Sequence, residues 1–385
     1  MGKPTGLVFI SGGSALNSLA STLAEKGLFS THIISAFDNG GSSRFLREAF
    51  NCIAIGDIRN RLCAIGGHGS QHSKNILTLF RKRLSENKPQ VVLKNTVESL
   101  ASGNSELPSD VPAEILHEIT LSLDALLTNI PKQFDWRNGS IGNFILIGRY
   151  LLERNWENVL NWAHKIIGAC GEVVPITTNG AHLGAVLKNG RKVLGQSTLT
   201  DQKRPIESPI DKIQLYRSDK NYAQYARAVP FPHALESINS ASVIIYSWGS
   251  FYTSILPAFL VDDVSEAVVN RSIPKVLLLN PFRDAELIGM TPFDVYSTLE
   301  RYILPEQATD TVQSAVTHVI ALKPEKHHID SFYNSSSLDK MRKQGVEIST
   351  INCEGLPQRQ QIEEVIKLIS DLAGNNNTHS QGAPQ

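Results

Sequence analysis

Two apolar runs joined by a glycine turn and a helix open the chain. Residues 6–11 form the first run, which ends in Gly12 and Gly13. A helical pattern of apolar residues follows, and Gly27 ends it. Residues 31–37 form the second run. This order of strand, turn, helix and strand predicts an α/β fold of the doubly wound, Rossmann-like kind, with a mostly parallel sheet.

Polar, glycine-rich segments follow both predicted strands. Gly12, Gly13 and Ser14 come after the first strand, and the segment Asp38–Ser43 (DNGGSS) comes after the second. Ligands of doubly wound folds bind beyond the carboxyl ends of the strands, so we expect one shared site. Adjacent glycines let the backbone approach a ligand closely, and the serines offer hydroxyl donors that suit a phosphate. For DNGGSS alone, an ordinary surface turn before a helix is the alternative.

The segment Gly56–Asn60 (GDIRN) combines a carboxylate with an arginine. Asp57 and Arg59 flank one residue, so on an extended segment both would project to the same side. Arg59 could then bind a phosphate through two N–H donors, and a salt bridge to Asp57 is the alternative. Asp38 and Asp57 would be available to a divalent cation such as Mg²⁺.

Two later strands also end in polar residues. The run at 241–247 leads into Trp248–Ser254 (WGSFYTS), and the run at 275–280 ends at Asn280. The glycine of WGSFYTS allows close approach, and its hydroxyl groups can cap a helix while an anion binds at the helix N-terminus. Capping without a ligand is the simpler interpretation of each cluster alone. Polar clusters at the ends of four strands together favour a phosphate-bearing ligand.

The middle of the chain predicts an inserted helical and hairpin region. Residues 85–112 are polar and rich in helix breakers, residues 113–127 form an amphipathic pattern, and an Asn-Gly turn at 189–190 predicts a hairpin. Residues 138–152 are interpreted as a loop that enters a buried helix. Asn143 lies at the mouth of that helix, where its amide could bind a base or a sugar hydroxyl, or simply cap the helix.

Composition excludes several classes of protein. The 385 residues include 37 basic and 37 acidic side chains, whereas a general nucleic-acid binder shows a basic excess. No stretch approaches the 18 consecutive apolar residues typical of a membrane span, and the N-terminus lacks a signal-peptide pattern. The four cysteines are scattered, which predicts reduced thiols without a zinc site. We therefore expect a cytoplasmic protein that binds neither nucleic acid nor membranes.

Taken in order, these motifs resemble those of the CofD-like family. Family members show GGTG, DDGGSS, GDIRN, SFGN, GSLYTSI and a late asparagine followed by GETDGYT. The corresponding segments here are residues 12–15, 38–43, 56–60, 140–143 and 249–255, with Asn280, Glu286, Gly289 and Thr291 for the last motif. The resemblance covers about residues 6–300. It implies a single CofD-like domain over residues 1–372, and we expect a disordered, asparagine-rich tail at 373–385.

The resemblance implies two functions. The family includes 2-phospho-L-lactate transferases, and also YvcK-type gluconeogenesis factors that bind UDP-sugars such as UDP-N-acetylglucosamine. We expect a nucleotide or nucleotide-sugar binding protein with a metabolic-regulatory role. The alternative is a phospholactate-type transferase, in which Asp38 or Asp57 would hold Mg²⁺ and Arg59 would stabilise charge on the phosphates. Asn39 replaces the second aspartate of DDGGSS, so one carboxylate of the transferase pattern is missing.

The candidate residues follow from the motifs and the resemblance together. The candidates for catalysis are Asp38, Asp57 and Arg59, of which the two aspartates are also the metal candidates. The candidates for nucleotide and phosphate binding are Gly12, Gly13, Ser14, Asn39, Gly40, Gly41, Ser42, Asn60, Asn143, Gly249, Ser250, Thr253, Ser254 and Asn280. No tightly bound organic cofactor is expected, and a homo-oligomer is plausible for this family.

Overall fold

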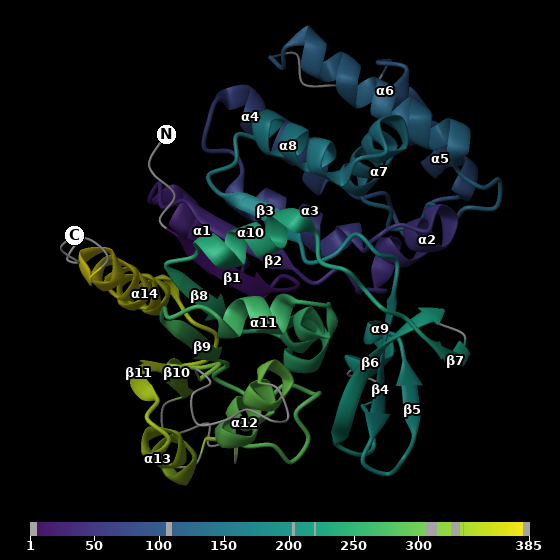
Figure 1. The fold of residues 1–385 in the computed structure, drawn as a ribbon. Coiled ribbons are helices and arrows are strands. Elements are labelled where there is room, and N and C mark those ends of the chain that lie inside the picture. Colours follow the sequence, from purple (N-terminus) through teal and green to yellow (C-terminus); the bar gives the residue numbers. More distant parts are fainter. Residues whose placement is uncertain are drawn as a thin grey trace.

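A parallel sheet of seven strands forms the centre of the protein (Figure 1). The computed structural model describes residues 6–104, 110–201, 205–218, 221–304, 314–324, 332–333 and 335–379. The strand order is β11-β10-β9-β8-β1-β2-β3, and every neighbouring pair is parallel. The strands are β1 (Leu7–Ser11), β2 (Ser30–Ile34), β3 (Glu172–Pro175), β8 (Val243–Tyr246), β9 (Lys275–Leu279), β10 (His318–Pro324) and β11 (Glu347–Cys353). The doubly wound α/β fold expected from the sequence is confirmed.

Helices bury both faces of this sheet. Alternate residues of β1 point to opposite faces, so Leu7 and Phe9 join one apolar cluster while Val8 and Ile10 join another. The first cluster packs against α1 (Asn17–Glu25) and α14 (Arg359–His379), and the second packs against helices that include α3 (Ile55–Ile65). Burial on both faces explains why the strands are nearly continuous apolar runs in the sequence.

The inserted helical region lies between β2 and β3. Its helices are α2 (Gly41–Phe50), α3, α4 (Gln71–Arg81), α5 (Gln90–Ala101), α6 (Ala113–Asn129), α7 (Ile141–Glu153) and α8 (Trp156–Ile166). The polar segment 85–112 therefore contains a helix, α5, whose Leu93, Val97 and Leu100 are buried. Helices α6 and α7 pack closely because Gly148 has no side chain; a Cβ atom there would collide with the carbonyl oxygen of Ser122.

A second, antiparallel sheet of four strands has the order β5-β4-β6-β7. Its strands are β4 (His182–Leu187), β5 (Lys192–Leu194), β6 (Ile210–Ser218) and β7 (Asn221–Tyr225). The hairpin predicted at 189–190 is confirmed between β4 and β5, and Gly190 supplies the positive φ that its turn requires. Strands β6 and β7 widen this hairpin into a sheet that the sequence did not predict.

The rest of the chain connects and covers the two sheets. Its helices are α9 (Gln196–Leu199), α10 (Pro232–Ser240), a π-helix (Phe251–Ile255), a 3₁₀ helix (Leu256–Leu260), α11 (Val264–Val269), α12 (Pro292–Ile303) and α13 (Ser335–Lys343). Helix α14 continues through part of the expected tail, as far as His379, and residues 380–385 lie outside the described residues. That residues 1–372 form a single domain stays a prediction.

We expect Gly148→Ala to lower the free energy of unfolding by about 1–3 kcal/mol, because the added methyl group must force α6 away from α7. Urea denaturation of the purified variant measures this change. Gly374→Ala is the matched control, since Gly374 is also helical and has no atom near its Cβ position. Equal stability of the two variants would show that α6 and α7 do not depend on this close contact.

Candidate functional site

The predicted polar clusters meet at one edge of the parallel sheet. β1 lies between β2 and β8, and β9 lies next to β8. All four strands are parallel, so the segments that follow them emerge at the same edge. From β1 the chain continues to β2 on one side of the sheet, whereas β8 and β9 lie on the other side of β1. The strand order therefore reverses between β1 and β8, and doubly wound folds bind ligands at such a switch point. The shared position expected for Gly12–Ser14, Asp38–Ser43, Trp248–Ser254 and Asn280 is confirmed.

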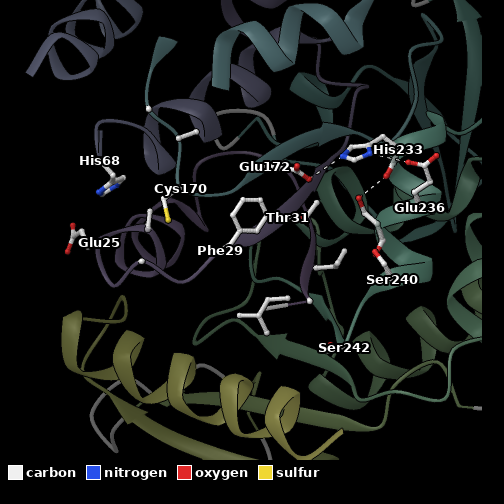
Figure 2. Close-up of a pocket in the computed structure, with 18 of the residues that line it drawn as sticks. Glu25, Phe29, Thr31, His68, Cys170, Glu172, His233, Glu236, Ser240 and Ser242 are labelled. Atoms are coloured by element: carbon white, nitrogen blue, oxygen red, sulfur yellow. Dashed lines mark hydrogen bonds and ion pairs between the residues drawn. The ribbon is translucent and has the colours of Figure 1, made fainter. Parts of the chain in front are cut away.

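A separate pocket of about 1080 Å³ lies at the opposite edge, beside the first residues of β1 and β3 (Figure 2). Phe29 lies in the middle of its lining, with His68 to one side and the group Glu172, His233 and Glu236 to the other. The His233 ring nitrogens are 3.1 Å from Glu172 and 3.3 Å from Glu236. None of the sequence-predicted site residues lines this pocket.

A buried arginine, Arg61, binds the backbone of the Gly12–Gly13 turn. Arg61 Nη2 donates to the carbonyl oxygens of Gly12, at 3.1 Å, and Gly13, at 3.0 Å. A trans peptide carries its N–H opposite its C=O, so inward carbonyls turn the following N–H groups outward. The first of these, the N–H of Gly13, donates to the carboxylate of Asp57. Arg61 therefore fixes the orientation in which this turn presents its donors.

A neutral histidine positions Arg61 in turn. Arg61 Nη1 lies 3.1 Å from His32 Nδ1, and His32 Nε2 lies 3.0 Å from the hydroxyl of Ser30. Burial, with help from the Arg61 charge, lowers the pKa of His32 well below its usual range. Because Arg61 can only donate, Nδ1 accepts, and the ring proton stays on Nε2 and faces Ser30. Sequence reasoning missed both residues; the signals were a histidine inside an apolar strand and an arginine just beyond GDIRN.

Two carboxylates meet beside this turn. The N–H of Gly40 donates to Asp38 Oδ1 at 2.9 Å, and burial raises the pKa of Asp38. Burial, followed by repulsion from Asp38, raises the pKa of Asp57 to about 7, although the nearby Arg61 charge opposes this shift. Two carboxylates that repel each other in a buried site favour a proton or a bound cation between them.

These oxygens fit Mg²⁺ better than they fit zinc. Mg²⁺ is usually bound by one or two carboxylates, with water and substrate phosphates completing the coordination. Within the described ranges, no group of three or more histidine, cysteine, aspartate or glutamate side chains could hold a metal ion. A cation at Asp38 and Asp57 would therefore depend on a ligand to complete its coordination.

Asp57 and Arg59 lie on different sides of helix α3. The interpretation that Asp57 and Arg59 project to one side is wrong, because the segment is the start of helix α3 rather than extended. Two residues apart on a helix corresponds to about 200° of rotation. Arg59 Nε donates to the side-chain oxygen of Asn143 at 3.2 Å. The alternative salt bridge between Asp57 and Arg59 is not found among the ion pairs of the described residues.

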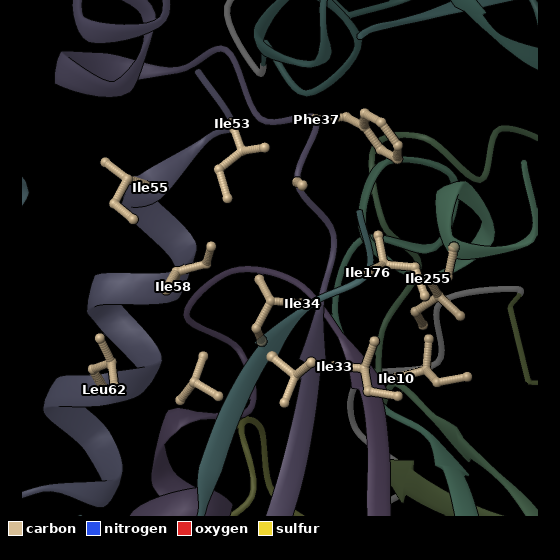
Figure 3. Packing of buried hydrophobic residues seen from close by; sticks show 14 of the residues in the cluster. Ile10, Ile33, Ile34, Phe37, Ile53, Ile55, Ile58, Leu62, Ile176 and Ile255 are labelled. Carbon is tan, nitrogen blue, oxygen red and sulfur yellow. The ribbon is translucent and has the colours of Figure 1, made fainter. Parts of the chain in front are cut away.

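Packing fixes the rotation of α3. Ile58 and Leu62, four residues apart on the helix, belong to the apolar cluster that contains Ile33 and Ile34 of β2 (Figure 3). All four side chains are buried, so rotating the helix would bring polar residues into this cluster. The apolar stripe thus holds Asp57 against Gly13 and leaves Arg59 at the interface with α7.

Several predicted ligand-binding side chains are engaged with the protein instead. The Asn280 amide accepts from Gly249 N–H at 2.9 Å and donates to Gly249 C=O at 3.0 Å. Thr253 donates its hydroxyl proton to Glu286 at 2.6 Å. Ser254 packs directly on Gly12, where a Cβ atom would collide with its hydroxyl group. These contacts make the Trp248–Ser254 segment one wall of the site.

Asn39 and Asn143 also have structural partners. The Asn39 side-chain oxygen accepts from the N–H of Ser197 at 2.8 Å, which ties the site to α9 beside the antiparallel sheet. The Asn143 side-chain oxygen accepts from Arg59, and the side chain that caps α7 is Ser140. The substitution of Asn39 for an aspartate therefore gives this position a neutral amide that already has a partner.

The remaining candidates lie on the segments that follow β1, β2 and β8 and on α3. Gly40 is the N-cap of α2, and Gly41 and Ser42 begin that helix, although their side chains lie outside the described ones. Ser14 is exposed after the glycine turn, and Ser250 is half-buried before the π-helix. Asn60 lies next to Arg59 on α3. The assignment of all these residues to ligand binding stays a prediction.

Comparison with known sequences decides the family. The family model described as "2-phospho-L-lactate transferase CofD" matches residues 7–354. The chain belongs to the CofD family. Relatives include a putative gluconeogenesis factor of Thermotoga maritima, 23% identical over 357 residues, which span 91% of this chain and 87% of that protein. A gluconeogenesis factor of Listeria monocytogenes is 25% identical over 287 residues, or 74% of this chain and 69% of the relative.

A solved structure confirms the fold of this CofD-family protein. A member of the UPF0052 family from Bacillus halodurans superposes with a TM-score of 0.67 at 19% sequence identity, covering 94% of this chain and 98% of that one. At this identity, the likeness concerns the fold alone. In the described part of the chain, no helix is long and apolar enough to cross a membrane.

We expect Asp57→Asn to raise the free energy of unfolding, by an amount that grows from pH 5 to pH 8. The folded protein keeps a proton on Asp57 up to about pH 7, whereas the unfolded chain loses it near pH 4. Wild-type stability therefore falls as the pH rises through this window, by up to about 1.4 kcal/mol per unit, and asparagine removes that loss. Urea denaturation of both proteins at several pH values measures the difference. An equal gain at pH 5 and pH 8 would contradict the raised pKa.

Proposed function

We propose that this CofD-family protein binds a nucleotide or a nucleotide sugar of the UDP-N-acetylglucosamine type, and that binding serves metabolic regulation. The observation that carries the proposal is the Gly12–Gly13 turn, fixed by Arg61 and facing the paired carboxylates Asp38 and Asp57. The names of the relatives as gluconeogenesis factors support the regulatory role.

The diphosphate would occupy the space between the glycine turn and the start of α2. The N-cap of α2 is Gly40, which offers no side chain to occupy the first N–H groups of the helix. Free N–H groups at a helix N-terminus bind phosphate well. Mg²⁺ bound by Asp38 and Asp57 would lie between the carboxylates and the phosphate and would screen the repulsion between their negative charges.

A phospholactate-type transferase is the second candidate. Asp57, with a pKa near 7, is suited to accept a proton from an acceptor hydroxyl at neutral pH. The hydroxyl oxygen would attack the donor phosphorus, and a nucleoside monophosphate would leave. Against this candidate, Asn39 is neutral and already bound to Ser197, so it supplies no further carboxylate to the reaction.

We expect Asp38→Asn to weaken Mg²⁺-dependent nucleotide binding by about tenfold or more. Asparagine keeps an oxygen that can accept from Gly40 N–H, so the variant removes the charge and leaves the turn intact. Calorimetric titration with UDP-N-acetylglucosamine, other UDP-sugars and GDP, each with and without Mg²⁺, measures the change. Asp124→Asn, on the exposed face of α6, is the matched control and should bind like the wild type.

The same titrations separate the candidate functions. Binding of a UDP-sugar without release of nucleoside monophosphate supports the regulatory binder. Mg²⁺-dependent binding of GDP, together with release of GMP from a diphosphate-linked donor in the presence of an acceptor alcohol, supports the transferase. Unchanged affinity in Asp38→Asn for every nucleotide would show that the proposed site is not the binding site.

A further inference from the structure

Arg59 carries a buried charge that forms no ion pair among those of the described residues. Its side chain is 5% exposed, and its Nη2 has no hydrogen-bond acceptor in the described part of the chain. Nε donates to the neutral amide of Asn143. The thiol of Cys63 lies against the guanidinium, and burial raises the pKa of this thiol, so it also stays neutral. A buried cation without a paired anion is unfavourable, and such groups normally acquire a partner.

The surroundings of Arg59 add further positive charge, and the only carboxylate among the strongest influences on its pKa is Asp57, with which it forms no ion pair in the described part of the chain. Arg81, at the end of α4, donates to the carbonyl oxygen of Cys63 at 2.6 Å, which places its guanidinium beside the same part of α3. The charge of Arg83 also acts on Arg59. The ion pairs of the described residues include neither Arg59 nor Arg81.

An open hollow of about 380 Å³ lies at these arginines, between α1, α3 and α4. Its polar lining consists of Asn17, Ser18, Ser21, Arg59, Asn60 and Arg81, with no acidic residue. The first turn of α1 contributes Asn17 and Ser18, and its N-cap, Leu16, has no side chain that can cap the helix. The positive end of the helix dipole thus adds to the two arginines.

We infer that this hollow is a second anion-binding subsite, which takes a phosphoryl group between Arg59 and Arg81. The phosphoryl oxygens would accept from the two guanidinium groups and from the amide and hydroxyl donors of the lining. The hollow belongs to the side of α3 that carries Arg59, whereas the nucleotide site proposed above uses the side that carries Asp57. A ligand of the hollow therefore binds together with a nucleotide and does not replace it.

The side-chain amide of Asn17 is a further polar group of the lining. Its oxygen is buried and has no hydrogen-bond partner in the described part of the chain. Turning the amide over exchanges this acceptor for two N–H donors at the same place. Either way round, the amide places a polar group beside the start of α1, where Asn17 lines the hollow.

Calorimetric titration with inorganic phosphate and with methyl phosphate, in a phosphate-free buffer of low ionic strength, tests the inference. We expect Arg81→Gln to weaken both by about tenfold or more, because Arg81 is exposed and its loss leaves the core unchanged. Lys74→Gln is the matched control: Lys74 is exposed on the same helix, outside the hollow, and its loss changes the net charge equally. It should bind phosphate within about twofold of the wild type.

Two further titrations make the result decisive. The nucleotide site could itself take phosphate, so the titrations are repeated with the protein saturated with UDP-N-acetylglucosamine or GDP: phosphate should still bind, and Arg81→Gln should still weaken this binding by about tenfold or more. Equal phosphate affinity in Arg81→Gln and Lys74→Gln, tighter binding of acetate than of phosphate, or loss of all phosphate binding in the nucleotide-saturated protein would each overturn the inference. The phosphate titration of free protein needs no nucleotide, so it stands even if the proposed function fails.

Discussion

Arg61 carries its charge at the centre of the protein, where it binds the carbonyls of Gly12 and Gly13 and is held by the neutral ring of His32. The rest of the site is arranged around this contact. The carbonyls of the turn have a donor in Arg61, and its Gly13 N–H is thereby directed to the carboxylate of Asp57. β1, β2 and α3 are fixed together by the same set of hydrogen bonds, since Gly12 follows β1, His32 lies in β2 and Arg61 lies in α3.

Burial of its carboxylates is what would favour a ligand at this site. Burial raises the pKa of both Asp38 and Asp57, and the Asp38 charge raises that of Asp57 further, although the charges of Arg47, Arg61 and Arg59 oppose these shifts. Without a ligand, the pair is relieved by binding a proton, at some loss of stability above neutral pH. A divalent cation with a phosphate would relieve the same repulsion more fully, which couples ligand binding to the stability of the fold.

Helix α3 separates two kinds of charge. Its apolar stripe, with Ile58 and Leu62, fixes the rotation of the helix against β2. Asp57 is thereby directed to the glycine turn, and Arg59 to Asn143 and the hollow beside Arg81. The short motif GDIRN thus supplies Asp57 to the proposed nucleotide site and Arg59 to the proposed phosphoryl subsite. Residues adjacent in the sequence come to act separately because a helix, unlike a strand, distributes them around its axis.

The sequence by itself determined the parallel sheet, the glycine turns and the edge at which the polar clusters meet, because apolar periodicity and glycine position follow from local physics. It also contained the residues of the family motifs, from Gly12 to Asn280. It could not show that Asn280, Thr253 and Asn39 bind other parts of the protein, or that Arg61 and His32 hold the turn. Those roles join residues 29 to 158 positions apart in the chain, so only tertiary packing decides them. The direction of Arg59 was decided in the same way, by the apolar stripe that sets the rotation of α3.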